Sequence, residues 1–154
     1  MRRLALIAVG AVALLFLFGR PVVWAEAALV MWDLAAGGRP TWWQDVTSAP
    51  GEQVIDWKDG EGDLYLPAGQ PRATMVLVPG AAVLGRDEPR LQAFARTFAR
   101  AGFAVMVPEL PEVRQLILSR ADADRVAGAL RELGRRLPDV PLGVAAISYA
   151  VAPA

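Results

Sequence analysis

The clearest candidate for chemistry is Ser148, which stands in the sequence Ala146-Ile147-Ser148-Tyr149-Ala150. A nucleophile elbow has the pattern G-x-S-x-G, in which a strained turn between a strand and a helix exposes the serine hydroxyl. The positions two before and two after the serine must be small to avoid a backbone clash, and both are alanine here. The pattern predicts a nucleophilic serine for acyl transfer. The alternative interpretation is a serine that caps the following helix.

A second candidate is the loop that follows the apolar run 73–78 and begins Pro79-Gly80-Ala81. Acyl transfer to a serine passes through a tetrahedral oxyanion, which enzymes stabilise with two backbone N–H groups. One of these belongs to the residue after the nucleophile, and the other comes from a loop after an earlier strand. We therefore predict the amides of Ala81 and Tyr149 as the oxyanion-hole donors.

The same loop also matches part of a phosphate-binding loop, because Gly80 is followed after four residues by Gly85-Arg86-Asp87. That motif requires Lys and then Ser or Thr at the last two positions, to reach the phosphates and magnesium. Asp87 would instead place a negative charge beside the phosphates. Nucleotide binding is therefore a minor alternative, and we interpret the charged run from Arg86 to Arg90 as a solvated loop before a helix.

Composition excludes several kinds of site within these 154 residues. There is no histidine and no cysteine, so the sequence contains no complete Ser-His-Asp triad, no His- or Cys-ligated metal and no disulfide. We predict no cofactor and no metal site, and we assign no role to Glu109, which follows an apolar strand. The 16 Lys and Arg residues balance 16 Asp and Glu residues, which argues against a nucleic-acid partner.

The pattern of apolar residues predicts the elements that must position these groups. Two short β runs on either side of Asp59-Gly60 predict a hairpin. Three apolar strands then alternate with two helices whose apolar residues recur at helical spacing, which predicts a parallel, doubly wound α/β sheet. The second helix opens at Ser119 with Asp122 three residues on, as in a capping box. The predicted strands are 53–57, 63–66, 73–78, 103–107 and 142–147.

The N-terminal part has a different character. Arg2 and Arg3 precede fifteen uncharged residues, 4–18, a pattern typical of a signal peptide or a membrane anchor. The segment is either cleaved after Ala27 or retained, and we favour retention; both place the remainder outside the cytoplasm. A helix is predicted over 24–36, and four of the five tryptophans fall between residues 24 and 43. This stretch is predicted either to lie along a bilayer surface or to pack on the folded domain.

Together, four stretches in this order resemble the α/β-hydrolase superfamily, in particular its dienelactone-hydrolase-like and serine-esterase-like members. They are residues 62–67, 76–80, 101–108 and the elbow at Ser148. The resemblance covers roughly residues 53–154 and implies hydrolysis of an ester or related acyl bond. It implies that Ser148 is the nucleophile and that Ala81 and Tyr149 hold the oxyanion. The usual His-Gly of the oxyanion loop is Pro79-Gly80 here.

In this family the acid and the histidine follow the elbow on further strands. We therefore expect the N-terminal part of a hydrolase domain, organised as anchor or signal (1–20), apolar helix and linker (21–52) and truncated α/β-hydrolase domain (53–154). The expected function is an exported or membrane-anchored serine hydrolase, inactive as these residues alone. The alternative is a non-catalytic membrane-associated binding or scaffold module, or an inert fragment. An open sheet edge predicts possible self-association.

Overall fold

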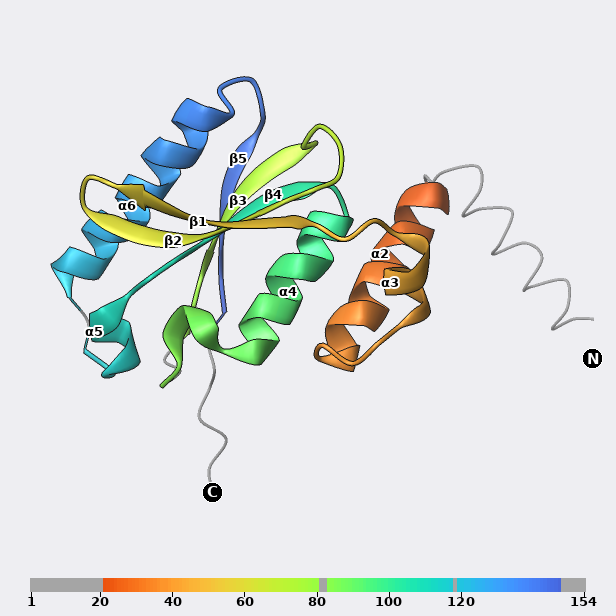
Figure 1. The fold of residues 1–154 in the computed structure, drawn as a ribbon, viewed down its shortest axis with the longest axis horizontal. Helices are drawn as coiled ribbons and strands as arrows, with labels where there is room; N and C mark the ends of the chain where they lie inside the picture. Colours follow the sequence, from red (N-terminus) through yellow and green to blue (C-terminus); the bar gives the residue numbers. More distant parts are fainter. Residues whose placement is uncertain (1–20, 81–82, 118, 148–154) are drawn as a thin grey trace, which may run out of the picture.

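A computed structural model of the chain describes residues 21–80, 83–117 and 119–147, and its centre is one mixed β-sheet (Figure 1). The five strands of this sheet follow the order β1-β2-β4-β3-β5. The strands are β1 (Gly51–Trp57), β2 (Gly60–Leu66), β3 (Ala73–Val78), β4 (Phe103–Pro108) and β5 (Leu142–Ala146). The helices are α2 (Pro21–Ala36), α3 (Trp42–Val46), α4 (Pro89–Arg100), α5 (Pro111–Arg114) and α6 (Arg120–Arg136), with a 3₁₀ turn η1 (Gly85–Asp87).

The strand directions confirm the predicted α/β sheet. β1 and β2 form an antiparallel hairpin whose turn is Lys58-Asp59, and β2 also runs antiparallel to β4. β3 runs parallel to both β4 and β5, so the predicted β-α-β-α-β unit is present. The hairpin strand β2 begins at Gly60, earlier than predicted, because the ladder continues to the Trp57–Gly60 pair.

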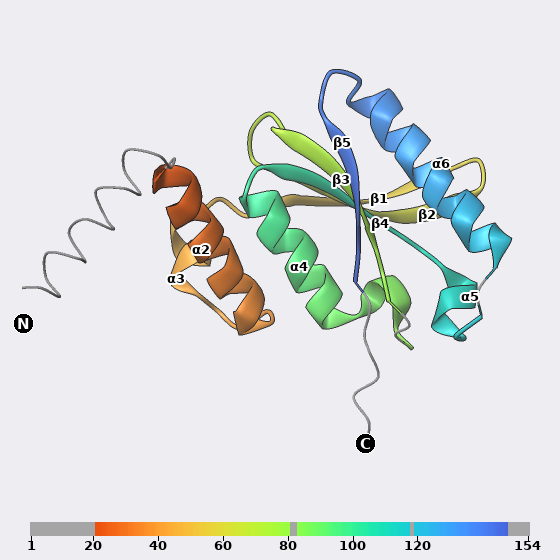
Figure 2. The same cartoon turned by 180° about the vertical axis from the view of Figure 1, so that it is seen from behind.

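Two apolar cores cover the two faces of the sheet. Successive residues of a strand point to opposite faces, and β3 accordingly contributes Leu77 to the core under α4 and Val76 to the core under α6. Leu91 and Ala95 of α4 are fully buried, as is Leu133 of α6. Figure 2 shows the helices from the opposite side of the sheet. These two layers hold the carboxyl ends of the parallel strands in a fixed arrangement.

The start of α6 departs in part from the predicted capping box. Ser119 is the N-cap, and its side chain accepts a hydrogen bond from the Ala121 amide at 3.1 Å. The Asp122 carboxylate, which a capping box directs back to the N-cap amide, instead accepts a hydrogen bond from the Val113 amide of α5 at 2.8 Å. Asp122 therefore joins two helices, because α5 brings an amide within reach that the sequence did not indicate.

The helix predicted over 24–36 is confirmed as α2, which begins at Pro21. It packs on the sheet domain through Asp33, which is 2% exposed and accepts hydrogen bonds from Thr41, Thr97 and Gln44. Within the described ranges, no helix has the length and hydropathy needed to cross a membrane. The predicted anchor or signal, 1–20, lies outside the described residues, and the three domain boundaries stay a prediction.

β5 lies at one edge of the sheet in the part of the chain that the structure describes. It pairs with β3 on one side, and Leu142 and Val144 remain 43% and 54% exposed. Both residues alternate with Ala145, which packs against the core under α4. The described residues therefore leave part of the apolar surface of β5 uncovered.

Candidate functional site

The two chain segments that carry the predicted site leave the sheet side by side. β3 and β5 are paired up to Val78 and Ala146, and the Ile147 amide donates a hydrogen bond to the Val78 carbonyl at 3.1 Å. Ser148 follows Ile147 directly, and Ala81 is three residues past Val78. Ser148, Tyr149 and Ala81 themselves lie outside the described residues. The structure thus places the residues that precede the predicted nucleophile and the predicted oxyanion loop next to each other, at the carboxyl ends of β5 and β3.

The loop after β3 is shaped by a close contact at Gly85. This buried residue has φ +56°, in the left-handed region that disfavours residues with a Cβ. A Cβ there would lie 2.6 Å from Cδ of Arg114, whose guanidinium Nε donates to the Val83 carbonyl at 3.0 Å. The left-handed backbone therefore favours glycine, and a Cβ here would also force the Arg114 side chain to shift.

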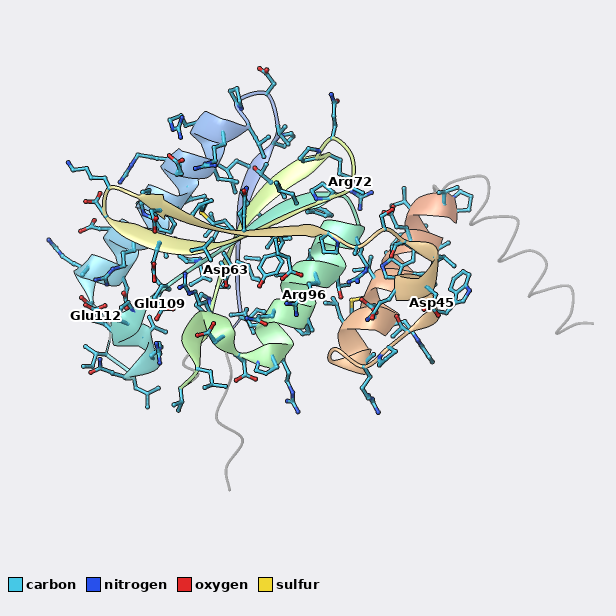
Figure 3. All side chains as sticks on the ribbon, viewed as in Figure 1. Asp45, Asp63, Arg72, Arg96, Glu109 and Glu112 are labelled. Carbon is cyan, nitrogen blue, oxygen red and sulfur yellow. The ribbon has the colours of Figure 1, made fainter. Side chains whose placement is uncertain are left out.

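Arg86 anchors the same loop to the sheet through three carboxylates. Its guanidinium lies 3.0 Å from Glu61, 3.7 Å from Asp63 and 3.5 Å from Glu109. The Arg86 side chain is only 18% exposed, so the interpretation of this part of the run as a solvated loop is wrong. The arginine turns inward because β2 and β4 place their acidic side chains next to the loop, as Figure 3 shows for Asp63 and Glu109.

Glu109, to which we assigned no role from the sequence, is part of this network. Its side chain is 15% exposed and accepts a hydrogen bond from Arg114 at 3.0 Å. Its amide donates to the Glu61 carbonyl at 2.9 Å, which extends the pairing of β2 with β4. Glu109 therefore bridges the two arginines that hold the loop after β3.

Burial raises the pKa of Asp63 above its usual value. The Arg86 guanidinium opposes this rise, whereas the charges of Asp87, Glu109 and Glu52 add to it. The network therefore holds its carboxylates close together with fewer cations than anions. Each carboxylate of the network is already paired with an arginine. We therefore interpret these pairs as the contacts that hold the loop after β3 in place.

A cleft of about 450 Å³ opens on the α6 side of the sheet, beside the end of β3. Its apolar lining comes from Val78, Leu110, Val113, Ala123 and Val126, and its polar lining from Ser119, Arg120 and Asp122. Small-molecule sites commonly have this size and this mixture of apolar walls with a few polar groups. Val78 belongs both to the cleft and to the edge that leads to Ser148.

Asp122 is the most buried acid at this cleft. Its side chain is 5% exposed and lies 2.7 Å from the Arg125 guanidinium, which also pairs with Glu112. Burial and the neighbouring Glu112 raise the pKa of Asp122, against the lowering effect of the Val113 amide and Arg125. Among the described residues, no group of three or more His, Cys, Asp or Glu side chains is arranged so that it could hold a metal ion.

The contacts of Arg86 could not be predicted from the sequence. Arg86 and Glu61 are 25 positions apart, and their contact depends on how three strands and a loop meet. A usable signal was present in one place only, because Glu109 stands at the carboxyl end of a predicted strand, where functional groups of parallel sheets gather.

No protein-family model matches this sequence, and no curated protein matches it either. The structure is similar to a dienelactone hydrolase from Anabaena variabilis ATCC 29413, with a TM-score of 0.54 and 21% identity over 66% of this chain and 53% of that one. A dienelactone hydrolase-like promiscuous phosphotriesterase from metagenomic libraries matches with a TM-score of 0.49 and 22% identity, over 65% and 50%. A membrane phospholipase A matches with a TM-score of 0.38 and 20% identity, over 94% and 44%.

The chain therefore has an α/β-hydrolase-like fold, as the sequence resemblance implies. It spans about half the length of the dienelactone hydrolase that it matches.

Proposed function

We propose that this chain carries the nucleophile and oxyanion-binding part of a serine hydrolase acting on an ester or related acyl bond. The observation that supports this proposal best is the hydrogen bond from the Ile147 amide to the Val78 carbonyl. It puts the residue before Ser148 beside the strand that leads to Ala81, and an elbow serine needs an oxyanion donor from such a loop.

In the proposed reaction, the Ser148 oxygen attacks the acyl carbon and its proton passes to a general base. The amides of Ala81 and Tyr149 stabilise the oxyanion that forms. The alkoxide leaving group takes up a proton as it departs, and water then hydrolyses the acyl-enzyme. Because the 154 residues contain no histidine, an imidazole base must come from outside them.

A serine-directed fluorophosphonate probe tests this function on the protein as the cell makes it. The proposal predicts covalent labelling at Ser148, loss of labelling in Ser148→Ala and unchanged labelling in the control Ser48→Ala. The 154 residues by themselves should remain unlabelled, since they lack the base. Folded native protein that is not labelled at Ser148 would contradict the proposal.

A non-catalytic binding or scaffold module on the same fold is the second candidate. Alanine replaces both glycines of the elbow, and this replacement tightens the turn that must expose the serine. The reading frame downstream of Ala154 separates the two candidates: an in-frame acid and histidine favour the enzyme, whereas a stop codon favours the module.

We further propose that the protein is exported and held at a membrane by residues 1–20. The support is the pair Arg2 and Arg3 before the uncharged run 4–18, since positive charge stays on the cytoplasmic side. Extraction of cell membranes at alkaline pH tests retention, and external protease tests the side. The folded domain should stay with the membrane and be digested from the extracytoplasmic face; release into the soluble fraction would contradict anchoring.

A further inference from the structure

The helix α2 is almost entirely apolar. Its two polar residues, Glu26 and Asp33, are seven positions apart and face the folded domain. Asp33 accepts hydrogen bonds from Thr97 of α4 and Thr41, both at 2.5 Å, and from Gln44 at 2.9 Å. Glu26 lies 2.9 Å from Arg72, which precedes β3. The polar side chains of α2 are therefore used in contacts with α3, α4 and the residue before β3.

The opposite side of α2 is entirely apolar and is exposed. Every residue of the helix in the exposed class is alanine, valine, methionine or tryptophan. Trp24, Met31 and Trp32 are 63%, 64% and 71% exposed, values far above those of large apolar side chains in a core. Figures 1 and 2 show α4 on one side of α2 and no described element covering its other side, α3 excepted.

These side chains form one continuous surface. At 3.6 residues per turn, seven exposed positions of α2 fall within half of its circumference. We define the α2 face by these positions: Val23, Trp24, Ala27, Ala28, Met31, Trp32 and Ala35. The adjoining α3 adds Trp42, which is 63% exposed. A helix that is apolar all round belongs in a protein core or in a membrane, and α4 covers only one side of this one.

We propose that the α2 face lies in the interfacial layer of a lipid bilayer, with the axis of α2 along the membrane surface. Tryptophan is the residue most typical of the membrane–water boundary, and the face and α3 together present three of them. The uncharged run 4–18 ends shortly before Pro21, so a membrane that receives it adjoins the start of α2. The proposal rests in this respect on the proposed anchoring.

The length and attachment of α2 determine this orientation. Its 16 residues extend about 24 Å at 1.5 Å per residue, less than the ~30 Å of a hydrocarbon core. The hydrogen bond that Asp33 accepts from Thr97 of α4 also prevents the helix from being surrounded by lipid. Because this bond and the Glu26–Arg72 ion pair join α2 to the sheet domain, docking of the α2 face fixes how the sheet is oriented above the membrane.

Charge near the face indicates which lipids it needs. Arg39, in the turn after α2, is offset by Asp45 of α3, and Asp33 is already bonded within the domain. Attraction to anionic headgroups therefore contributes little, and burial of apolar surface supplies the binding free energy. Docking should be alike on zwitterionic and anionic membranes and should change little with salt.

The chain has no cysteine, so a single introduced cysteine can carry a spin label without background. We would label Ala28→Cys and Ala35→Cys on the face, and Asp124→Cys on α6 as the aqueous control, in the full chain bound to phosphatidylcholine vesicles with or without phosphatidylglycerol. Labels at 28 and 35 should collide with oxygen and be shielded from a water-soluble nickel chelate. The label at 124 should show the reverse.

Two further variants exclude a merely structural effect. Trp32→Glu should move the label at 35 towards the nickel-accessible range without lowering the unfolding temperature, because Trp32 is 71% exposed. The matched control Val54→Glu, at an exposed apolar residue of β1, should leave the label at 35 unchanged.

Three results would overturn the proposal. Nickel-accessible labels at 28 and 35 in vesicle-bound protein would show that only the leader inserts, and would leave the anchoring intact. Labels that become immobile with rising protein concentration in the absence of vesicles would assign the face to a second copy of the chain. A full chain that does not bind vesicles at all would remove both the docking and the anchoring.

Discussion

The α2–α3 arm and the loop after β3 are both attached to the sheet domain through acidic side chains, but by different physical means. Asp33 fastens the arm with hydrogen bonds from neutral hydroxyl and amide groups. Asp63, Glu61 and Glu109 fasten the loop through the charge of Arg86. The charge of Asp33 is stabilised mainly by hydrogen bonds, with a smaller contribution from Arg100, whereas the ion network depends on the guanidinium groups of Arg86 and Arg114.

The pKa values of the two acids follow this difference. Burial alone raises the pKa of Asp33, but the three hydrogen bonds, with a contribution from the Arg100 charge, bring it below its usual value of 3.8. Burial also raises the pKa of Asp63, and Arg86 only partly offsets it. The charged form of Asp33 therefore stabilises the fold, whereas the charged form of Asp63 destabilises it.

Removal of the Asp33 carboxylate should give the largest effect. Asp33→Ala leaves the hydroxyls of Thr41 and Thr97 without this acceptor, and hydrogen bonds to charged groups contribute about 1.5–3 kcal/mol each. We expect the free energy of unfolding to fall by about 3 kcal/mol, together with faster amide exchange in α2. Urea unfolding and hydrogen exchange measure these. Asp45→Ala, in α3, is the control, and equal losses in both variants would refute the role given to Asp33.

Gly85→Ala should have the next largest effect, at the other region. A Cβ at φ +56° and 2.6 Å from Arg114 Cδ costs about 1–2 kcal/mol, since a left-handed non-glycine residue is strained while the arginine can shift. Thermal unfolding would detect this loss. The change should also slow fluorophosphonate labelling of the native protein. Gly69→Ala, which has open space around it, should match the unsubstituted protein in both measurements.

Arg86→Gln should destabilise the protein by about 1 kcal/mol, since the side chain is largely covered but its partners are partly exposed. Three acids lose their shared cation, so the loss should be greater at neutral pH than at a pH low enough to protonate them. Unfolding by urea at two pH values measures the difference. Arg90→Gln, at an exposed residue in the first turn of α4, should change neither value.

The smallest effects are expected from neutralising each acid, and their signs should be opposite. The folded pKa of Asp63 lies above 3.8, so its charge lowers stability as the pH rises through 3.8; Asp63→Asn should gain a few tenths of a kcal/mol at neutral pH. The folded pKa of Asp33 lies below 3.8, so its contribution is present above 3.8 and is lost as the pH falls through the folded value. Asp33→Asn should lose stability at neutral pH and approach the unsubstituted protein in acid. A change in stability of the same sign in both variants would contradict the predicted difference between Asp33 and Asp63.

Much of the fold could be predicted because its signals are local. The run 73–78 is apolar at every position except Thr74, and the structure has a strand with the same bounds. Pro89 and Gly102 bracket α4 as predicted, and Gly102 has φ +90° just beyond the helix. The short elements α3, α5 and η1 were not predicted, because a single turn of helix contains too few residues to show a period.

The candidate site could be predicted only in part. The elbow at Ser148 and the loop at Ala81 are named by the sequence, and the pairing of β3 with β5 brings the segments before them together. The contacts of Arg86 and of Asp33 could not be predicted, since each joins residues that the sequence separates widely. The residues next to an arginine or aspartate in the sequence do not indicate which distant residue its side chain will contact.

The sequence by itself determined the order of strands and helices, the place of the predicted nucleophile and the exclusion of a complete triad, because periodicity and composition are properties of neighbouring residues or of the whole chain. Only the tertiary structure decided that the polar side of α2 faces inward and its tryptophan side outward. The reason is physical: a buried carboxylate must be hydrogen-bonded, and its three donors, Thr97 of α4 with Thr41 and Gln44 of the α3 segment, come together on one side of the helix.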